Sequence, residues 1–499
     1  MDAPTHTLEE WSARAAKLEL RGRALIDGEH VDAASGETFE SVNPATGRAL
    51  GEVAAGGAED VDRAVRAARR AFDQGSWSEA SPADRKRVLV RLAELIGEHG
   101  DELALLDSLD MGKPVEDAVS VDVPGAAGVF GWYGEAADKL YDEIAPTGGG
   151  DLALVTREPL GVVGAVVPWN FPLDLASWKV APALVAGNSV VLKPAEQSPF
   201  SAIKLAELAL EAGLPAGVLN VVPGFGETAG RAIGLHPEID CVAFTGSTEV
   251  GKLFLRYSSE SNAKQVWLEC GGKSPNLVFA DCEDLEQASE MAALGIFFNQ
   301  GEVCSANSRL LVERSLKEEL VERLIVRARS VRVGDPLDPE TTMGPVVDAE
   351  HAERVMGHIA AGREVAELRI GGDRVAVDGY DTCFVEPTIF DGVANDARLA
   401  QEEIFGPVLA VLDFADEEEA LRIANESRYG LAASIWTSNL GRAHRLARRL
   451  RVGTVSVNTV DALSPQTPFG GFKASGFGRD LSLHALDKYT GLKTTWIKL

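Results

Sequence analysis

From Gly161 onward, the chain alternates short runs of β-branched residues with helix-like segments, and this alternation constrains the fold more than any other feature. The runs are GVVGAVVP, SVVLKP, VLNVVPG, CVAFTG and QVWLE. Strands separated by helices at this spacing predict a parallel sheet covered on both faces. Ligands on such sheets bind beyond the carboxyl ends of the strands. The sequence therefore predicts an α/β fold with a site at one edge of this sheet.

A second series of the same kind starts near Ser274, with the runs PNLVFAD, RLLVER, PVLAVLDF, ASIWTS and GTVSVN. A chain of 499 residues exceeds one hydrophobic core, so two or three domains are expected. A PTGGG break at 146–150 is a plausible boundary. The last residues, KTTWIKL, alternate like an edge strand, which often pairs with another subunit or domain.

The first 140 residues have a different pattern, which predicts short strands in an irregular segment and then helices. Short strands are predicted over Ala24–Asp27 and Thr38–Val42. Amphipathic helices are predicted over Glu59–Gln74, Ser81–His99 and Pro124–Leu140. Ser81 can cap the second of these helices, because its hydroxyl precedes a proline suited to the first turn.

The charge of the chain excludes two classes of partner. Asp and Glu number 76 against 48 Lys and Arg, a net charge of -28. Nucleic acids and anionic membranes both require a basic footprint, so neither is expected as a partner. The five cysteines form no CxxC pair, the N-terminus MDAPTHTLEEW has no apolar core, and no apolar run approaches about 20 residues. We expect a cytoplasmic protein.

One cysteine, Cys304, stands apart from the others. It follows a glycine in FFNQGEVCSANSR (297–309), just beyond a helical apolar run. A thiolate in such a loop can meet a ligand and be stabilised by backbone N–H groups. Taken alone, a half-buried structural thiol is the more common explanation, and only partner groups elsewhere favour a nucleophile.

Polar residues follow several of the predicted strands. The segment FTGSTEVG (244–251) places hydroxyls where a strand enters a helix, and helix N-termini favour phosphate oxygens. Lys193 and Glu196 are either a solvated pair or ligands of an adenosine ribose, and a carboxylate there would repel a 2′-phosphate. Glu269 is either a structural carboxylate or a base with a raised pKa. Asn170 either caps a helix or donates to an oxyanion.

Eight motifs together resemble the aldehyde dehydrogenase superfamily, from about Arg21 to Leu499. They are PWNFP (168–172), LKPAEQSP (192–199), GFGETAG (224–230), FTGSTEVG (244–251), LECGGKSPN (268–276), FNQGEVC (298–304), EEIFGP (402–407) and PFGGFKASGFGR (468–479). The stretches DVPGAAGVFGWYGEAADKLYDEI, VWLECGGKSPNLVFADCEDL and RDLSLHALDKYTGLKTTWI are most similar to the γ-glutamyl-γ-aminobutyraldehyde dehydrogenase group. Two departures stand out: Cys270, where Leu is common, and Asp480, where Glu is common.

The resemblance implies two doubly wound αβα domains, one Rossmann-like for NAD and one catalytic, plus a small β element for oligomerisation. The implied divisions are 1–141 with 160–270 for NAD, 271–465 for catalysis, and 142–159 with 482–499 for bridging in a homodimer or homotetramer. It makes Cys304 the nucleophile, Glu269 the general base and Asn170 part of the oxyanion hole. The reaction implied is oxidation of an aldehyde to the free acid through a thiohemiacetal and a thioester, as the CoA-acylating branch typically lacks the glutamate.

The resemblance also implies two sets of binding residues. NAD, preferred over NADP, would contact Pro168, Trp169, Lys193, Glu196, Gly226, Gly230, Phe244, Thr245, Ser247, Gly271, Glu403 and Phe405. The substrate tunnel would be lined by Phe171, Asp174, Leu175, Trp178, Phe298, Val303, Ser305, Leu463 and Phe469. Most of the tunnel set is apolar, as suits the chain of an aldehyde.

Asp174 is the exception in the tunnel set and has two interpretations. It turns outward or caps the following helix, where Asp is common. Alternatively, it faces the tunnel and pairs with an ammonium or guanidinium group, which would make the substrate a cationic ω-amino- or guanidino-aldehyde. The resemblance adds γ-glutamylamino-aldehydes, and it implies a role in polyamine or amino-acid catabolism. A broad aliphatic or aromatic aldehyde dehydrogenase is the alternative.

Other classes of function fit the sequence less well. A non-redox thiol hydrolase or acyltransferase would need a histidine partner for Cys304, and no such motif is present. A structural protein on the same fold would not need Cys304, Glu269 and Asn170 together. No metal site is expected, because the sequence has neither HExxH nor a Cys/His cluster.

Overall fold

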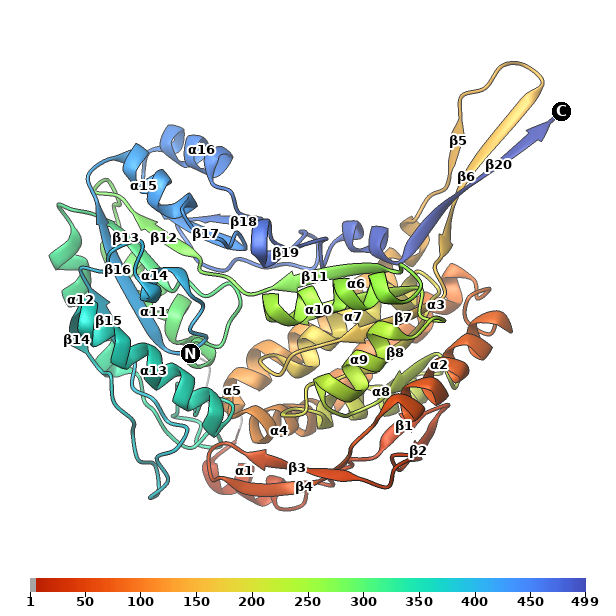
Figure 1. The fold of residues 1–499 in the computed structure, drawn as a ribbon, viewed down its shortest axis with the longest axis horizontal. Coiled ribbons are helices and arrows are strands. Elements are labelled where there is room, and N and C mark those ends of the chain that lie inside the picture. The colour runs from red at the N-terminus through yellow and green to blue at the C-terminus, as the bar shows by residue number, and fades with distance from the viewer. Residues whose placement is uncertain (1–5) are drawn as a thin grey trace.

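The computed structural model describes residues 6–499, and the first five residues of the acidic N-terminus lie outside this range. Figure 1 shows two α/β units side by side and a β arm that projects from one of them, with the C-terminus on the arm. The predicted α/β class is therefore confirmed. No helix within residues 6–499 has both the length and the apolar character required to cross a bilayer.

The first sheet is parallel in its centre. Its order is β19 (Gly476–Phe477), β11 (Gln265–Cys270), β10 (Cys241–Gly246), β7 (Val162–Val166), β8 (Ser189–Lys193), β9 (Leu219–Val221), β1 (Ala24–Ile26) and β2 (Glu29–Val31). Strands β11 to β9 run parallel, whereas β1, β2 and β19 join antiparallel at the edges. The five runs predicted from Gly161 are thus neighbouring parallel strands.

Helices cover both faces of this sheet, as the apolar character of its strands requires. On β7, Val162 packs in one core and Val163 in the other, because successive side chains point to opposite faces. One core includes α2 (Ala58–Asp73), α9 (Arg231–Leu235) and α10 (Thr248–Glu260). The other includes α3 (Pro82–Glu98), α4 (Gly100–Met111), α6 (Val123–Ala136), α7 (Pro172–Val185) and α8 (Phe200–Glu211). Ser81 caps α3 as predicted.

The second sheet has the order β14 (Glu367–Ile370), β15 (Thr388–Asp391), β16 (Val408–Phe414), β13 (Arg309–Glu313), β12 (Pro275–Val278), β17 (Ala432–Trp436) and β18 (Thr454–Val457). Only β14 is antiparallel within this described sheet. Its helices are α11 (Leu285–Phe297), α12 (Lys317–Ser330), α13 (Ala349–Val365), α14 (Arg398–Gln401), α15 (Glu417–Asn425) and α16 (Leu440–Arg449).

The arm is a sheet of β5 (Glu143–Ala145), β6 (Asp151–Pro159) and β20 (Thr490–Lys498). Strand β20 pairs with β6 over its full length and leaves its other edge unpaired within the described chain. The remaining elements are α1 (Leu8–Ala15), the hairpin β3 (Thr38–Asn43) and β4 (Arg48–Ala54), α5 (Val115–Asp117), and the short turns η1 (Ala118–Asp122), η2 (Ala137–Lys139), η3 (Gly226–Gly230), η4 (Phe298–Gly301), η5 (Lys473–Ser475) and η6 (Leu483–Lys488).

Candidate active site

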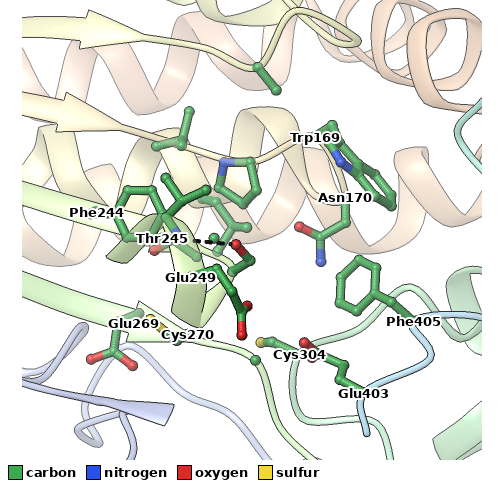
Figure 2. A pocket seen from close by; sticks show the side chains of 18 of the residues that line it. Trp169, Asn170, Phe244, Thr245, Glu249, Glu269, Cys270, Cys304, Glu403 and Phe405 are labelled. Atoms are coloured by element: carbon green, nitrogen blue, oxygen red, sulfur yellow. Dashed lines mark hydrogen bonds between the residues drawn. The ribbon is translucent and has the colours of Figure 1, made fainter. Parts of the chain in front are cut away.

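A cavity of about 540 Å³ lies at the carboxyl ends of β7, β8, β10 and β11, where the first sheet faces loops of the second unit (Figure 2). This is the position expected for a ligand on a parallel sheet. The predicted residues that line it are Pro168, Trp169, Asn170, Leu175, Trp178, Lys193, Glu196, Gly226, Phe244, Thr245, Ser247, Glu269, Gly271, Cys304, Glu403, Phe405 and Phe469. All three predicted catalytic side chains therefore meet in one space.

A strained turn delivers Cys304 to this cavity. After α11 ends, Asn299 and Gln300 adopt left-handed backbone angles (φ of 48° and 57°), and Gly301 follows with φ of 73°. Non-glycine residues in this region cost free energy and are retained where surrounding contacts fix them. Here the Asn299 amide donates to the backbone oxygens of Asn170 and Glu302, at 3.0 and 3.2 Å. The turn therefore ties the cysteine loop to the end of β7.

The Asn170 amide lies beside the same loop. Its Nδ2 donates to the backbone oxygen of Glu302 at 2.9 Å, two residues before Cys304. An amide nitrogen carries two hydrogens, so this bond fixes the side chain and leaves a second N–H for another acceptor. Asn170 is buried and labelled near Cys304 in Figure 2. This geometry suits a donor to an oxyanion formed at the sulfur.

The environment of Cys304 disfavours the thiolate. Burial raises the pKa of the thiol, and the carboxyl groups of Asp461, Glu403 and Glu269 raise it further. A charged sulfur among carboxylates is costly because like charges repel. The thiol is thus held protonated by the side chains present, and a positive charge brought into the cavity would favour its ionisation.

Glu269 lies next to the last residue of β11 and lines the cavity. Both carboxylate oxygens are buried, and neither has a hydrogen-bond partner within residues 6–499. Burial and the charge of Asp480 raise its pKa well above the usual range, while Lys179, Lys488 and Arg479 oppose this shift. In Figure 2 its carboxyl group points away from Cys304. A carboxyl of raised pKa in a cavity is the type of group that serves as a general base.

The far end of the cavity combines a cation, a carboxylate and a helix start. Lys193 is buried at the end of β8, and its Nζ contacts Glu196 Oε2 at 3.3 Å and the backbone oxygen of Pro194 at 2.8 Å. The Ser247 hydroxyl caps α10, and the Thr245 hydroxyl is buried with no partner among the described residues. Such groups suit sugar hydroxyls and phosphate oxygens.

Gly230 is the one predicted cofactor residue that does not line the cavity. A Cβ at this position would lie 3.7 Å from Lys193 Cδ, so the residue borders the stem of that lysine. The structure thus places Gly230 behind the binding surface.

The Glu403 carboxylate lies directly against the backbone of Gly271 and Gly272 on the cavity wall. The Gly272 N–H donates to Glu403 Oε1 at 2.9 Å, and burial raises the pKa of Glu403 to about 7. A Cβ on Gly271 would lie 1.9 Å from Glu403 Oε2, so only glycine allows this carboxylate to occupy its position. Phe405 follows with φ of 60° and packs edge-on against Trp169, with ring centroids 5.3 Å apart.

Sequence reasoning missed several side chains of this cavity, among them four basic ones and the carboxylates Glu249 and Glu402. His351, Arg354 and His358 line it from α13, and Arg428 lines it from the loop before β17. The first three have the spacing i, i+3 and i+7, which places them on one face of a helix. This spacing was the feature of the sequence that could have indicated a shared site. Burial and Arg354 lower the pKa of His351 to about 4, so the positive charge here comes from the arginines.

The predicted tunnel residues divide into two sets. Leu175, Trp178 and Phe469 line the cavity, and the rings of Trp178 and Phe469 lie 5.4 Å apart. The structure does not place the other six on the cavity wall: Phe171, Asp174, Phe298, Val303, Ser305 and Leu463. Phe171 and Phe298 stack 6.3 Å apart beyond the cysteine loop, and Leu463 is exposed.

Asp174 lies on the face of α7 that meets α6. The helix has no side-chain cap, so Asp174 does not cap it. Its Oδ1 is buried without a partner among the described residues, and a Cβ on Gly125 would lie 2.9 Å from this oxygen. Burial and the charge of Asp122 raise the pKa of Asp174 to about 7, against the effect of Lys113. It is a carboxyl group that lacks a counter-ion of its own.

The residues present fit a dinucleotide. One cavity includes Lys193, Glu196 and Cys304, and a glycine leaves room in it for Glu403. The Thr245 hydroxyl on its wall has no partner among residues 6–499. Lys193, Arg354 and Arg428 bring cations to a wall that Glu196 and Glu403 also line. Cations suit phosphate oxygens, and carboxylates suit sugar hydroxyls. No group of three or more His, Cys, Asp or Glu residues within 6–499 is arranged to hold a metal ion.

Comparison with known proteins agrees with this site. A model described as the aldehyde dehydrogenase family matches residues 30–495. The NADP/NAD-dependent aldehyde dehydrogenase PuuC of Escherichia coli is 52% identical over 494 residues, which are 99% of this chain and 99% of that protein.

Two solved structures are similar to this chain in both sequence and fold. The indole-3-acetaldehyde dehydrogenase AldA of P. syringae, in complex with NAD+ and IAA, is 56% identical with a TM-score of 0.98, over 99% of this chain and 100% of that chain. The γ-glutamyl-γ-aminobutyraldehyde dehydrogenase of Burkholderia cenocepacia is 55% identical with a TM-score of 0.97 and the same coverage. The resemblance predicted from the motifs is confirmed. The chain belongs to the aldehyde dehydrogenase family and is an oxidoreductase that acts on aldehydes.

Proposed function

We propose that the protein oxidises an aldehyde to the free carboxylic acid with NAD, using Cys304 as a covalent nucleophile. The observation that carries this proposal is the meeting of Cys304, Asn170 and Glu269 in one cavity that continues to Lys193 and Glu196. A hydrolase would need the first three but not an extension lined by Lys193, Glu196 and the start of α10. The arrangement suits a reaction that unites a thiol, a water-activating carboxylate and a dinucleotide.

In the first half of the proposed reaction, the Cys304 thiolate adds to the aldehyde carbon to give a thiohemiacetal. Its oxyanion accepts hydrogen bonds from the free N–H of Asn170 and the backbone N–H of Cys304. The Asn170 side chain is already fixed by Glu302, so it need not reorganise. When the thiohemiacetal collapses, the C=O bond re-forms and the hydrogen on that carbon leaves as hydride, so Cys304 then carries a thioester. A bound dinucleotide would supply the hydride acceptor that the protein side chains lack.

In the second half, the thioester on Cys304 is hydrolysed. Glu269 takes a proton from water as the water attacks the acyl carbon, and the Cys304 sulfur leaves. Its raised pKa suits this role, because a base with a pKa nearer neutrality accepts a proton more readily. The carboxylate in Figure 2 is turned away from the sulfur, so the side chain rotates to reach this water.

We propose NAD in preference to NADP because of Glu196. Its carboxylate, held 3.3 Å from Lys193 Nζ, would accept hydrogen bonds from ribose hydroxyls and repel a 2′-phosphate. PuuC is named an NADP/NAD-dependent enzyme, which supports either dinucleotide as a ligand of this family.

We propose a substrate with a cationic end, an ω-amino-, γ-glutamylamino- or guanidino-aldehyde from polyamine or amino-acid breakdown. The support is Asp174, whose buried Oδ1 has no hydrogen-bond partner among residues 6–499. It lies one helix position before Leu175 of the cavity wall, so a substrate that reaches past this wall would meet it. A charge-assisted contact with an ammonium would satisfy it. The substrate named for the B. cenocepacia structure carries an ammonium group, although a carboxylate stands next to it. The substrate named for AldA is aromatic, and the apolar Leu175, Trp178 and Phe469 suit the broader alternative.

We also propose a role for each domain and a cellular compartment for the protein. Residues 1–141 with 160–270 would hold the dinucleotide and 271–465 would carry the nucleophile, since the cavity draws Lys193 from the first sheet and Cys304 from the second unit. The five cysteines are free, which supports a reducing compartment such as the cytoplasm.

Asp174→Leu tests the substrate class. With NAD and then with NADP, we expect the wild type to prefer 4-guanidinobutanal to hexanal, measured as kcat/KM from NADH absorbance. Removing the carboxylate should lower that preference about 10- to 100-fold, because a hydrogen bond to a charged group contributes about 1.5–3 kcal/mol. Asp174→Asn, which keeps the shape, should lose preference similarly. An unchanged ratio in both variants would contradict the cationic substrate and favour a broad aldehyde dehydrogenase.

A further inference from the structure

A buried ionic network lies directly behind Glu269. Asp480 bridges two lysines: its Oδ2 contacts Lys179 Nζ from α7, and its Oδ1 contacts Lys488 Nζ from η6. All three side chains are at most 3% exposed. Asp480 and Glu269 both line the cavity, so the network forms part of its wall.

The backbone fixes the position of this network. Phe469 and Asp480 exchange backbone hydrogen bonds of 2.8 and 2.7 Å, which anchor the carboxylate beside the end of β11. Leu481 and Ser482 then adopt left-handed angles, with φ of 58° and 51°, and turn the chain into η6. This reversal brings Lys488 back onto Asp480, eight residues after it.

The charges of the network do not balance by themselves. Two ammonium groups meet one carboxylate, which leaves one excess positive charge in a buried region where a charge is costly. Glu269 is the neighbouring group that can supply the missing negative charge. A Cβ on Gly470 would lie 2.6 Å from Glu269 Oε1, and the adjoining Phe469 is paired through its backbone with Asp480. With Glu269 ionised, two cations face two anions.

The other titratable groups around the network leave this count unchanged. Tyr133 donates its hydroxyl to the backbone oxygen of Ser482, and burial raises the pKa of Tyr133 and of Tyr489. The thiol of Cys241 contacts the backbone oxygen of Lys488, and burial raises its pKa to about 12. Cys270 and Cys304 beside Glu269 also have raised pKa values, so these groups are neutral at working pH.

Arg479 is the remaining charge near Glu269. It is half-buried, donates to the backbone oxygens of Gly471 and Gly478, and lies over the exposed ring of Phe472. Its charge is partly exposed to water and is therefore screened more than that of the lysines. Lys179 and Lys488 each contact one oxygen of Asp480, so loss of either lysine would remove the surplus charge. Lys488 is the one that lies outside α7, a helix that contributes Trp178 to the cavity wall.

We propose that Lys488 is a positioning residue whose ammonium group supplies the surplus positive charge that keeps Glu269 ionised and ready to activate water. It touches neither Cys304 nor the cavity and acts through Asp480 and the local field. This inference rests on the proposed role of Glu269 as the hydrolytic base. Its signature is a change in the pH dependence of hydrolysis, not in the formation of the thioester.

Lys488→Met tests this inference. Removing a positive charge raises the pKa of a neighbouring carboxyl, so the base form of Glu269 should be lost at higher pH. We expect the acidic limb of the kcat–pH profile to move up by about one pH unit, kcat at pH 7 to fall about tenfold, and kcat near pH 9.5 to stay within about twofold of wild type. The burst of NADH with 4-guanidinobutanal or hexanal, whichever wild type turns over faster, should keep its amplitude.

Three further variants control the test. Lys488→Arg keeps the charge and should show the wild-type kcat–pH profile. Lys488→Gln takes the place of Lys488→Met if that variant fails to fold. Lys264→Met removes another buried lysine, which contacts the backbone oxygen of Gly234 at 2.7 Å away from the network, and should leave the profile unchanged.

A profile of Lys488→Met or Lys488→Gln that overlays wild type would overturn the proposal, as would an equal loss at every pH or a failure of Lys488→Arg to restore it. Glu269→Gln separates this from the proposed function. A Glu269→Gln variant that still hydrolyses the thioester would refute the role of Glu269 itself. A stalled Glu269→Gln with an unshifted Lys488→Met would refute only the role of Lys488.

Discussion

The neighbours of Glu403 determine both the position and the pKa of its carboxylate. Its carboxylate is fixed by the Gly272 N–H and occupies space that only glycine at position 271 leaves open. Burial raises its pKa to about 7, so it ionises within the range in which enzymes are assayed. An ionised carboxylate accepts hydrogen bonds from sugar hydroxyls better than a neutral one does.

A pH-dependent affinity for NAD follows from this raised pKa. Glu403 is ionised above about pH 7 and becomes protonated as the pH falls through that value. We expect the Kd for NAD, from fluorescence titration, to rise about fivefold between pH 8 and pH 6 as a charge-assisted hydrogen bond weakens. Glu403→Gln should bind weakly and equally at both pH values. A Kd that is independent of pH in the wild type would show that Glu403 does not contact the dinucleotide.

Single residues were predictable where a motif surrounds them. Cys304, Glu269 and Asn170 each follow a strand or a glycine turn, and the structure brings all three to one cavity. His351 and Lys488 were not predictable in the same way, because each reaches the site from a distant helix or turn through a fold that local sequence does not specify. Asp174 was predicted in the tunnel, but nothing in the sequence indicated that it faces Gly125.

Elements with a clear period were predicted well, and those without one were not. The β-branched runs of both sheets became strands because their length and flanking turns distinguish them from helices. Helix α4 was missed because its residues Leu103–Met111 are all buried, and a helix buried on every side shows no polar face. Its start at Gly100 also directly follows α3, so no turn separates the two.

The arm exposes large apolar side chains that nothing within one chain covers among the described residues. Leu492 and Trp496 of β20 are 65% and 63% exposed, as is much of Ile144 on β5. The free edge of β20 can continue into another sheet, which agrees with the predicted homodimer or homotetramer.

Trp496→Glu tests this prediction. A charge on the exposed apolar face of β20 should disfavour its burial between subunits, so light scattering after size exclusion should show a smaller species than wild type. Thr495→Glu, on the opposite face of the same strand, is the matched control and should keep the wild-type mass. A wild-type protein that is monomeric would refute the prediction, as would a Trp496→Glu variant of unchanged mass.

At the scale of the whole molecule, the cavity exists because the two units meet. The first sheet contributes Lys193, Glu269 and the start of α10, while the second unit contributes Cys304 and Glu403. The two sheets were foreseeable from the strand patterns, but their relative placement was not, because the packing of two units depends on side chains from many segments. The resemblance to known enzymes predicted that both units contribute to one site, which the periodicity of the sequence could not do.

The central claim is that the Cys304 sulfur carries the substrate as a thioester that Glu269 helps to hydrolyse. Intact mass measurement of Glu269→Gln, mixed with NAD and the aldehyde that wild type turns over fastest, tests it most directly. We predict one burst of NADH and an acyl adduct on Cys304, while Cys304→Ala still binds NAD but forms neither, with oxidation reduced more than about 1,000-fold. Normal turnover by Cys304→Ala, or the absence of an adduct on a stalled Glu269→Gln, would contradict the account.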